Sequence, residues 1–499
     1  MADNLLLGLQ VAFSMQNLIF CFVGALLGTL VGVLPGLGPV ATIAVLLPIT
    51  FSLPPDGALI MLAGIFYGAQ YGGSTTAILL NLPGEVSSVV TALDGHEMAR
   101  AGQGGVALAT AAMASFFAGC CATLLVALCG PLLVSAAQSL QPADYFSIMA
   151  AGLIISVTLA SGSVLGAIAM ILAGLILGLV GMDINSGVRR MTFGIPELTE
   201  GIDFVAMIMG LFGVTEVLSN LAGLKEGGRT TAPISSLLPR WGQVKRAAPA
   251  AVRGTFIGAL TGLLPGAGVS LGSFMSYAAE KKVSRRPQEF GKGAIEGVAG
   301  PEAANNSAAQ TAFVPLLSLG IPGNPVMAVM AGAMMIHGLA PGPLLMENHP
   351  RIFWGMIVSM WIGNLMLLVI NLPLVGLWVK LLSVPYRMLF PTILIICSIG
   401  AYTMANSTFN IMVMLIFGLI GFGLRVLRLE PAPLALGFVL GPMMEENLRR
   451  ALLLSRGDAM VFVERPISLS FLVVSLLMPA LILTPAIRGR REQVFAESD

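Results

Sequence analysis

Charged residues are scarce in this sequence. Only 10% of its 499 residues are charged, 56% are hydrophobic, and the mean hydropathy is +0.89. A soluble globular chain carries about 25% charged residues. Positive charge is scarcest in the first half, where Arg100 is the only Lys or Arg before Arg189. This composition argues against a soluble enzyme and predicts an all-α polytopic membrane protein that is surrounded by the lipid bilayer.

Residues that commonly bind metals or act as nucleophiles are also few. The chain has three histidines and five cysteines: His96, His337, His349, Cys21, Cys120, Cys121, Cys129 and Cys397. The cysteines all lie in apolar segments, and none has metal-ligand spacing with a histidine. No nucleophile–base pair and no metal set can be assembled from these residues, so we expect no enzyme activity and no cofactor.

The basic residues that are present gather in short stretches between apolar segments. These stretches are 225–253, 281–292, 449–456 and 488–491. Short basic loops stay in the cytoplasm, which predicts a cytoplasmic linker at 223–249 and a cytoplasmic tail at 488–499. The stretches are not interleaved with aromatic residues, so we expect no nucleic-acid partner. The first ten residues contain no basic residue, which predicts no cleaved signal peptide.

Apolar stretches of about 20 residues, the length that crosses a bilayer, recur along the chain. They predict about 12 transmembrane helices, several of them interrupted by glycine and proline. The stretch 252–279 is too short for two crossings, and Arg253 and Lys281 mark its two ends. Because both ends favour the cytoplasm, we predict a re-entrant hairpin with its tip at Pro265-Gly266.

Two motifs occur twice and predict an internal repeat. GALLGTLVGVLPGLG at 24–38 matches GTFIGALTGLLPGAG at 254–268, and ILLNLPG at 78–84 matches LSLGIPG at 317–323. The first motif has glycines at four-residue steps and ends in Pro-Gly-x-Gly, which is typical of a packed helix that ends in irregular backbone. We therefore predict two transmembrane repeats, 1–222 and 250–487, with broken helices or re-entrant hairpins.

Loop charges indicate how the repeats are oriented. The loop 49–57 has no Lys or Arg, whereas its counterpart at 280–292 has five. This difference favours inverted repeats, because equivalent loops would then lie on opposite sides of the membrane. A loose match of Arg189-Arg190 with Arg449-Arg450 favours the parallel alternative. We expect inverted repeats, with a substrate site where they meet.

Polar patches at equivalent positions of the repeats are the candidate substrate site. The candidates are Ser74, Thr75, Thr76 and Asn81 in the first half, Asn305, Asn306, Ser307 and Gln310 in the second, and the two tips, Pro35, Gly36, Gly38, Pro265, Gly266 and Gly268. Backbone N–H groups, hydroxyls and amides can bind a carboxylate without a buried Lys or Arg. Backbone and amide carbonyls can bind sodium, for which we expect a site near Gly36, Asn81, Gly266 and Asn306. The alternative is structural, because glycine stripes commonly pack helices and single Ser or Thr residues commonly bond within the helical framework.

The sequence resembles a known family at several long motifs. These are GVLPGLGPVATIAVLLP at 32–48, YGAQYGGSTTAILLNLPGE at 67–85, DGHEMARAGQ at 94–103, RMTFGIPELTEGIDF at 190–204, GLLPGAGV at 262–269 and ENLRRALLLSRGD at 446–458. They are similar to the large membrane subunit of tripartite tricarboxylate transporters, the TctA family, and the resemblance covers nearly the whole chain.

The resemblance implies a function. Members of that family form the transport pathway in the bacterial inner membrane, together with a small membrane subunit and a periplasmic solute-binding protein that delivers a carboxylate. A sodium or proton gradient drives uptake, and accordingly the sequence has no GxxxxGK[ST] motif. We expect symport of citrate or another tricarboxylate, a dicarboxylate or an aromatic acid. A stand-alone ion-coupled carrier or a channel for another small anion is the alternative.

Overall fold

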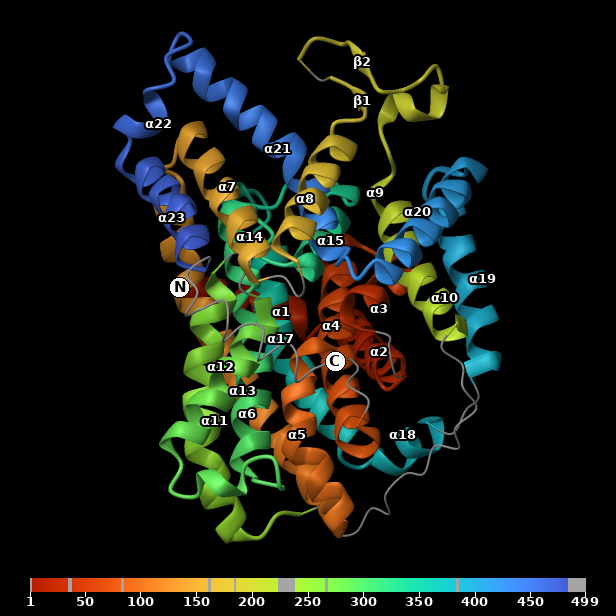
Figure 1. Ribbon diagram of the computed structural model, residues 1–499, viewed down its shortest axis with the longest axis vertical. Helices are drawn as coiled ribbons and strands as arrows, with labels where there is room; N and C mark the ends of the chain where they lie inside the picture. The colour runs from red at the N-terminus through yellow and green to blue at the C-terminus, as the bar shows by residue number, and fades with distance from the viewer. Residues whose placement is uncertain are drawn as a thin grey trace.

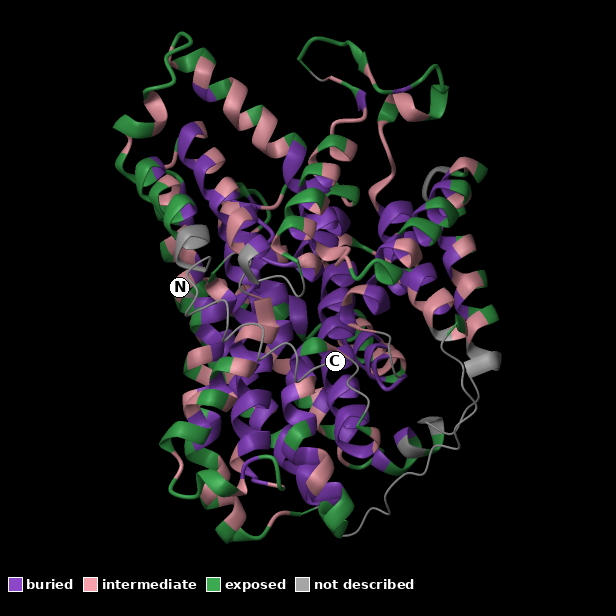
Figure 2. Ribbon diagram, viewed as in Figure 1, coloured by how far each residue is buried: buried purple, intermediate pink, exposed green. Residues whose placement is uncertain are grey.

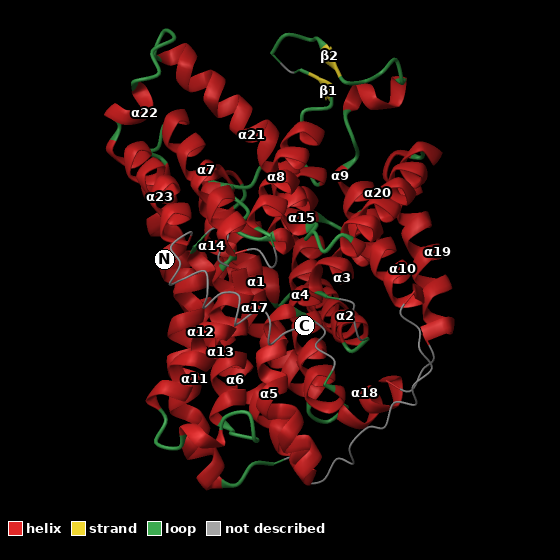
Figure 3. Cartoon of the chain, viewed as in Figure 1, coloured by secondary structure: helices red, strands yellow, loops and turns green. Residues whose placement is uncertain are grey.

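The computed structural model describes residues 2–34, 38–81, 85–159, 163–183, 185–222, 238–264, 268–382 and 386–482. Helices make up nearly all of these residues (Figure 3). The one sheet among them is an antiparallel pair of short strands, β1 (Gly181–Met182) and β2 (Arg189–Arg190). The predicted all-α fold is confirmed.

The helices up to residue 222 include two π-helical segments, η3 and η5. In order they are α1 (Ala2–Ala12), α2 (Met15–Gly32), α3 (Pro39–Leu46), η1 (Leu47–Thr50), α4 (Pro55–Leu80), η2 (Val86–Ser88), α5 (Val89–Met98), η3 (Ala99–Gln103), α6 (Gly104–Ala137), α7 (Pro142–Leu159), α8 (Val164–Gly178), η4 (Pro196–Glu200), α9 (Phe204–Ile208), η5 (Met209–Val214) and α10 (Thr215–Ala222).

The remaining helices begin inside the expected linker, at Trp241 (Figure 1). They are α11 (Trp241–Leu263), α12 (Gly268–Val283), η6 (Pro287–Glu289), α13 (Glu296–Thr311), α14 (Phe313–Leu319), α15 (Pro325–Ile336), α16 (Pro343–Asn348), α17 (Pro350–Asn371), α18 (Val375–Leu382), α19 (Tyr386–Ala405), α20 (Thr408–Val426), α21 (Ala432–Leu454), α22 (Val461–Glu464) and α23 (Pro466–Ile482).

Four of the described helical segments are long and apolar enough to cross a membrane: Met15–Gly32, Val86–Ala137, Pro350–Asn371 and Thr408–Val426. Shorter apolar helices of 10–17 residues account for other predicted spans. Buried residues concentrate in the middle of the helical body, while outer helices such as α20 carry exposed faces (Figure 2). The exposed residues of α20 include the large apolar side chains of Leu415 and Leu419, a surface suited to lipid. The number of about 12 crossings stays a prediction.

The two glycine stripes pack helices together in the same way. A Cβ atom added to Gly28 on α2 would overlap the carbonyl oxygen of Ile65 on α4. One added to Gly258 on α11 would overlap the carbonyl oxygen of Ala304 on α13. The same overlap occurs at Gly24, Gly32, Gly254 and Gly262. The packing interpretation of these glycines is confirmed, and each stripe lets two backbones touch.

The stretch 252–279 belongs to two longer helices, α11 and α12, which flank the predicted tip; re-entry into the membrane stays a prediction. Arg253 near the middle of α11 binds Glu280 near the end of α12, with two N–H···O bonds of 2.7 and 2.6 Å. Both arms of the hairpin therefore start from the same end of the molecule. Residues 265–267 at its tip, and residues 35–37 in the first half, lie outside the described residues.

The second repeated motif also produces matching geometry. Asn81 ends α4 with a left-handed φ of 55°, and Gly320 ends α14 with a φ of 74°. Four residues later Glu85 caps η2 and Asn324 caps α15. One difference is that α4 is continuous, whereas α13 and α14 are separated at residue 312, because Pro315 lacks the N–H that would continue the helix.

The proposed match between Arg189-Arg190 and Arg449-Arg450 is wrong. Arg190 belongs to the strand β2, whereas Arg449 lies within the helix α21. Both arginines bind Asp183 and Glu445 in one ion-pair cluster at the same end of the molecule. The two Arg-Arg pairs are therefore similar in sequence but not equivalent in structure, and they do not support parallel repeats.

Candidate functional site

The polar patches of α4 and α13 meet at the carboxylate of Glu302. Ser74 on α4 donates a hydrogen bond of 2.8 Å to Glu302 Oε1. Thr91 on α5 donates to the same oxygen at 2.7 Å, and Ser115 on α6 donates to Oε2 at 3.2 Å. Glu302 is 1% exposed. Residues more than 180 positions apart in the chain therefore form one buried polar centre.

The two asparagines of α13 extend this centre. Asn306 Nδ2 donates to Ser115 Oγ at 2.7 Å and to the backbone oxygen of Glu302 at 3.1 Å. Asn305 Nδ2 donates to Glu85 Oε1 at 3.0 Å. Asn305 Oδ1 is buried and has no hydrogen-bond partner among the described residues. The predicted residues Ser74 and Asn306 thus lie in one hydrogen-bonded network with Glu302, and Asn305 pairs with Glu85 beside it.

Other predicted residues bond to their own or neighbouring helices. Thr75 and Thr76 donate to carbonyl oxygens one turn earlier on α4. Ser307 donates at 2.8 Å to the backbone oxygen of Thr255 on α11. Gln310 Oε1 accepts a bond of 3.3 Å from Thr123 on α6. The contacts of Ser307 and Gln310 join neighbouring helices, those of Thr75 and Thr76 stay within α4, and Thr75 also lines a cavity beside Glu302.

The tips are only partly described. Pro35, Gly36, Pro265 and Gly266 lie outside the described residues. Gly38 caps α3 with extended backbone, and Gly268 begins α12 with a φ of +66°, a value that favours glycine. Asn81 is exposed, whereas Asn306 is buried. The sodium site expected near Gly36, Asn81, Gly266 and Asn306 stays a prediction.

A small cavity adjoins the Glu302 carboxylate. Its lining is Tyr71, Ser74, Thr75, Leu108, Ala111, Ala112, Ser115, Glu302, Asn371, Leu372 and Val375. It leaves about 20 Å³ for the centre of a water molecule, room for roughly one water. The hydroxyl of Tyr71 and Oδ1 of Asn371 are buried without a hydrogen-bond partner among the described residues. The cavity therefore combines polar and apolar side chains and is too small for a tricarboxylate in this conformation.

Sequence reasoning missed three residues of this centre. Glu302 begins the polar patch of α13 and is its only carboxylate, which is a signal that could have singled it out. Thr91 and Ser115 are single hydroxyl residues within their helices and carry no such signal. Their importance follows only from the packing of α5 and α6 against α13.

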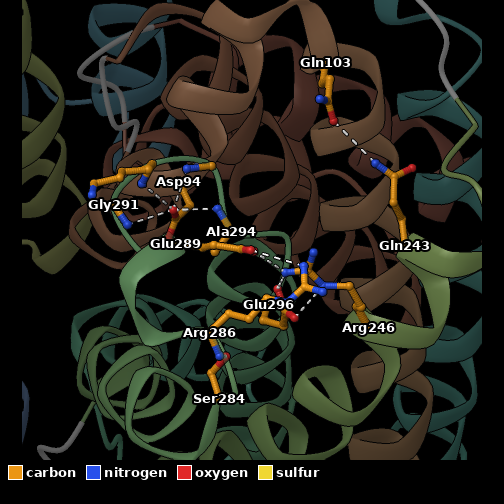
Figure 4. Close-up of polar contacts among 12 residues, drawn as sticks. Asp94, Gln103, Gln243, Arg246, Ser284, Arg286, Glu289, Gly291, Ala294 and Glu296 are labelled. Atoms are coloured by element: carbon orange, nitrogen blue, oxygen red, sulfur yellow. Dashed lines mark hydrogen bonds and ion pairs between the residues drawn. The ribbon is translucent and has the colours of Figure 1, made fainter.

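A second polar centre lies at the end of the molecule near the α12–α13 loop (Figure 4). Asp94 Oδ1 accepts backbone N–H bonds of 2.8–3.1 Å from residues 291–294, and Tyr277 donates to Oδ2 at 3.0 Å. Nearby, Arg246 binds Glu289 and Glu296. The Arg246 guanidinium lowers the pKa of the Glu289 carboxyl. This centre joins α5 to the second half through structural contacts.

Within the described part of the chain, no three His, Cys, Asp or Glu side chains form a group that could hold a metal ion. The donor set around Glu302 consists of one carboxylate with hydroxyl and amide oxygens. Such oxygens suit protons and hard cations.

The helical body and its buried polar centre define an all-α membrane protein. Residues 18–436 match the family described as the tripartite tricarboxylate transporter TctA family. The chain therefore belongs to this family of transporters. The family resemblance expected from the sequence motifs is confirmed.

Two relatives come from Agrobacterium vitis. An uncharacterized 52.8 kDa protein in the TAR-I ttuC' 3' region is 55% identical over 497 residues, which cover 100% of this chain and 99% of the relative. An uncharacterized protein in the TAR-II ttuC' 3' region is 57% identical over 242 residues, which cover 48% of this chain and 100% of the relative. No solved structure matches the chain.

Proposed function

We propose that this chain is the transport-pathway subunit of an ion-gradient-driven importer of carboxylates. A periplasmic solute-binding protein delivers the substrate, and a small membrane subunit completes the transporter in the bacterial inner membrane. The observation that carries the proposal is the buried contact between Ser74 and Glu302, where polar patches from the two halves meet. Membership of the tripartite family supports the partners.

Alternating access is the proposed mechanism, with inverted repeats that rock about the buried centre. Its support is the course of the helices that follow the two matching breaks. In Figure 1, α5 runs toward the lower end of the molecule, whereas α15 lies in the upper half. Equivalent helices that leave the centre in opposite directions are what an inverted repeat produces. The small cavity corresponds to a conformation that must open further to admit a carboxylate.

The network supplies donors for an anionic substrate. Asn305 and Asn306 carry amide N–H groups, and Ser74 carries a hydroxyl that can rotate. Binding of a carboxylate would replace their present side-chain acceptors with substrate oxygens: Glu85 for Asn305, Ser115 for Asn306 and Glu302 for Ser74. We infer that these residues recognise the carboxylate groups, while the identity of the rest of the substrate depends on the open pocket.

The test is uptake of labelled citrate, a dicarboxylate or an aromatic acid into vesicles that contain the chain with both partner proteins. We expect accumulation that requires a sodium or proton gradient and the binding protein. Ser74→Ala and Asn305→Ala should each lower the uptake rate at least about tenfold, the effect of one lost charge-assisted bond. Ser359→Ala is the matched control, because the hydroxyl of this buried serine donates to a backbone oxygen of its own helix α17.

Two outcomes would contradict the proposal at different levels. Uptake that persists without a gradient and without the binding protein would argue for a stand-alone carrier or a channel. Saturable counterflow separates a carrier from a channel. Normal uptake in both Ser74→Ala and Asn305→Ala would leave the transport function standing and would reject the assignment of the site.

A further inference from the structure

Four carboxylates are essentially buried in the described part of the chain: Asp94, Asp144, Glu280 and Glu302, each at most 1% exposed. The first three are compensated by strong partners. Arg465 binds Asp144 at 2.6 Å, and Arg253 binds Glu280 through two bonds. Four backbone N–H groups converge on Asp94. Burial of a carboxylate in this protein therefore normally comes with a cation or a set of backbone donors.

Glu302 departs from this pattern. Every described hydrogen-bond donor to its carboxylate is a hydroxyl group, on Ser74, Thr91 or Ser115. A hydroxyl supplies a dipole and no net positive charge. An ionised carboxylate at membrane depth is costly unless a proton or a cation accompanies it. An ionised Glu302 therefore needs a proton or a cation from solution to balance its charge.

The surroundings of Glu302 fit such a species. Ser74, Thr91 and Ser115 present hydroxyl oxygens that can turn from donors into ligands. The unpartnered Tyr71 hydroxyl and Asn371 Oδ1 line the same cavity, and both side chains are more than nine-tenths buried. The free space suits one water molecule, or an ion of similar size. The polar atoms of this lining are all oxygens and carry one negative charge, which favours a single monovalent cation.

We propose that Glu302 is the binding site of the coupling cation, either a proton on its carboxylate or a sodium ion held by the surrounding oxygens. This inference rests on the proposed function. It also supplies the coupling, because an ionised Glu302 would repel an anionic substrate in the adjoining amide network. A cation on Glu302 removes that repulsion, so cation and carboxylate favour each other's binding by the same factor.

Other titratable groups surround the site and must be considered in a pH experiment. They are Tyr71 on α4, Glu85 before η2, Asp94 on α5, Cys120 on α6, Glu280 on α12 and, exposed on α18, Lys380. Asp94 and Glu280 have the partners given above, and Glu85 accepts from Asn305. A pH effect is therefore assigned to Glu302 only when a substitution at Glu302 removes it.

The experiment measures thermal unfolding of the purified full chain in a membrane mimetic. Sodium replaces choline at constant ionic strength in one arm, and pH varies without sodium in the other. A bound cation stabilises the folded chain as its concentration rises. We expect the Tm to rise over each tenfold increase in sodium, or to change with pH in the absence of a sodium effect. Glu302→Gln, which keeps the size of the side chain, should abolish the dependence, whereas Glu446→Gln at an exposed ion pair should retain it.

These outcomes distinguish sodium from the proton as the bound cation, and they test the assignment of the site to Glu302. A sodium effect lost in Glu302→Gln assigns sodium, and a pH effect lost in Glu302→Gln assigns the proton. No dependence in the wild-type chain, or an equal dependence in Glu302→Gln, overturns the proposal. If Glu302→Gln does not fold, Ser115→Ala replaces it, since it removes one ligand oxygen and keeps the carboxylate. An unchanged sodium or pH midpoint in Ser115→Ala then overturns the proposal.

Transport separates this inference from the proposed function. Wild-type vesicles that never accumulate a carboxylate under any cation gradient would reject the function, while cation binding lost in Glu302→Gln would still support the site. Conversely, gradient-driven accumulation by Glu302→Gln at the wild-type rate would reject the site and leave the function intact. The expected result is a loss of at least about tenfold in accumulation, the effect of one removed charge interaction.

Discussion

The carboxylate of Asp94 receives four hydrogen bonds from backbone N–H groups of the segment that leads into α13 (Figure 4), and a fifth from Tyr277 on α12. Asp94→Ala leaves these donors without an acceptor. Hydrogen bonds to a charged group contribute about 1.5–3 kcal/mol, so we expect the loop to open about tenfold more often or more. Trypsin cleavage after Lys292 measures that opening directly.

A neighbouring exposed carboxylate provides the control for this prediction. Glu97 pairs with Arg100, and both side chains are more than one-third exposed. Glu97→Ala should change stability by less than about 0.5 kcal/mol and leave cleavage at Lys292 unchanged. Equal protection of Lys292 in wild type and Asp94→Ala would show that the loop is held by other contacts.

Some residues of the buried centre were predictable from the sequence, and others were not. Ser74, Asn305 and Asn306 stand out because runs of polar residues interrupt apolar helices at equivalent places. Thr91 and Ser115 were not predictable, because a single hydroxyl in a helix commonly bonds a carbonyl of its own helix. Only the crossing of α5 and α6 over α13 aims them at Glu302.

At the scale of helices, the glycine stripes make a sharp prediction. A Cβ atom at Gly28 or Gly258 would overlap a backbone carbonyl oxygen, which cannot turn aside as a side chain can. Gly28→Ala and Gly258→Ala must push the helices apart. Overpacking of this kind costs about 1–3 kcal/mol, so we expect each variant to lower the Tm in a membrane mimetic.

Gly423 on α20 is the matched control, because nothing lies within 4 Å of a Cβ atom at this position. Alanine favours a helix over glycine by about 1 kcal/mol. Gly423→Ala should therefore leave the Tm unchanged or raise it. An equal fall in Tm for Gly423→Ala and Gly258→Ala would mean that helix packing at the stripe is not the cause.

The breaks between helices were easier to predict than the lengths of the helices. Pro-Gly sequences require irregular backbone, and Asn81 and Gly320 show it in the left-handed φ values next to each break. Span lengths were harder, because hydropathy does not distinguish one long crossing from two short helices joined at a break. The division of α13 from α14 and the continuity of α4 illustrate this ambiguity.

At the scale of the molecule, charge distinguishes the two ends. The end formed by the start of α11, the end of α12 and the α12–α13 loop carries a group of basic residues: Arg240, Lys245, Arg246, Lys281, Lys282, Arg285, Arg286 and Lys292. The β1–β2 hairpin lies at the other end (Figure 1), where Arg190 and Arg449 are paired with acidic residues. By the positive-inside rule, we expect the end that carries this group of basic residues to lie in the cytoplasm.

Inverted repeats can be tested at two equivalent alanines. Ala101 follows α5, Ala340 follows α15, and both are exposed. Their separation of 239 residues equals that of the two copies of the second repeated motif. Ala101→Cys and Ala340→Cys replace one small side chain by another, so both variants should fold. Because α5 leads toward the basic end, an impermeant maleimide added outside intact cells should label Ala340→Cys, and it should label Ala101→Cys only after permeabilisation.

The unsubstituted chain gives the background from its own cysteines, and labelling after denaturation confirms that each new thiol reacts. Labelling of both positions from the same side would establish parallel repeats and remove the basis for rocking about a central pseudo-two-fold axis.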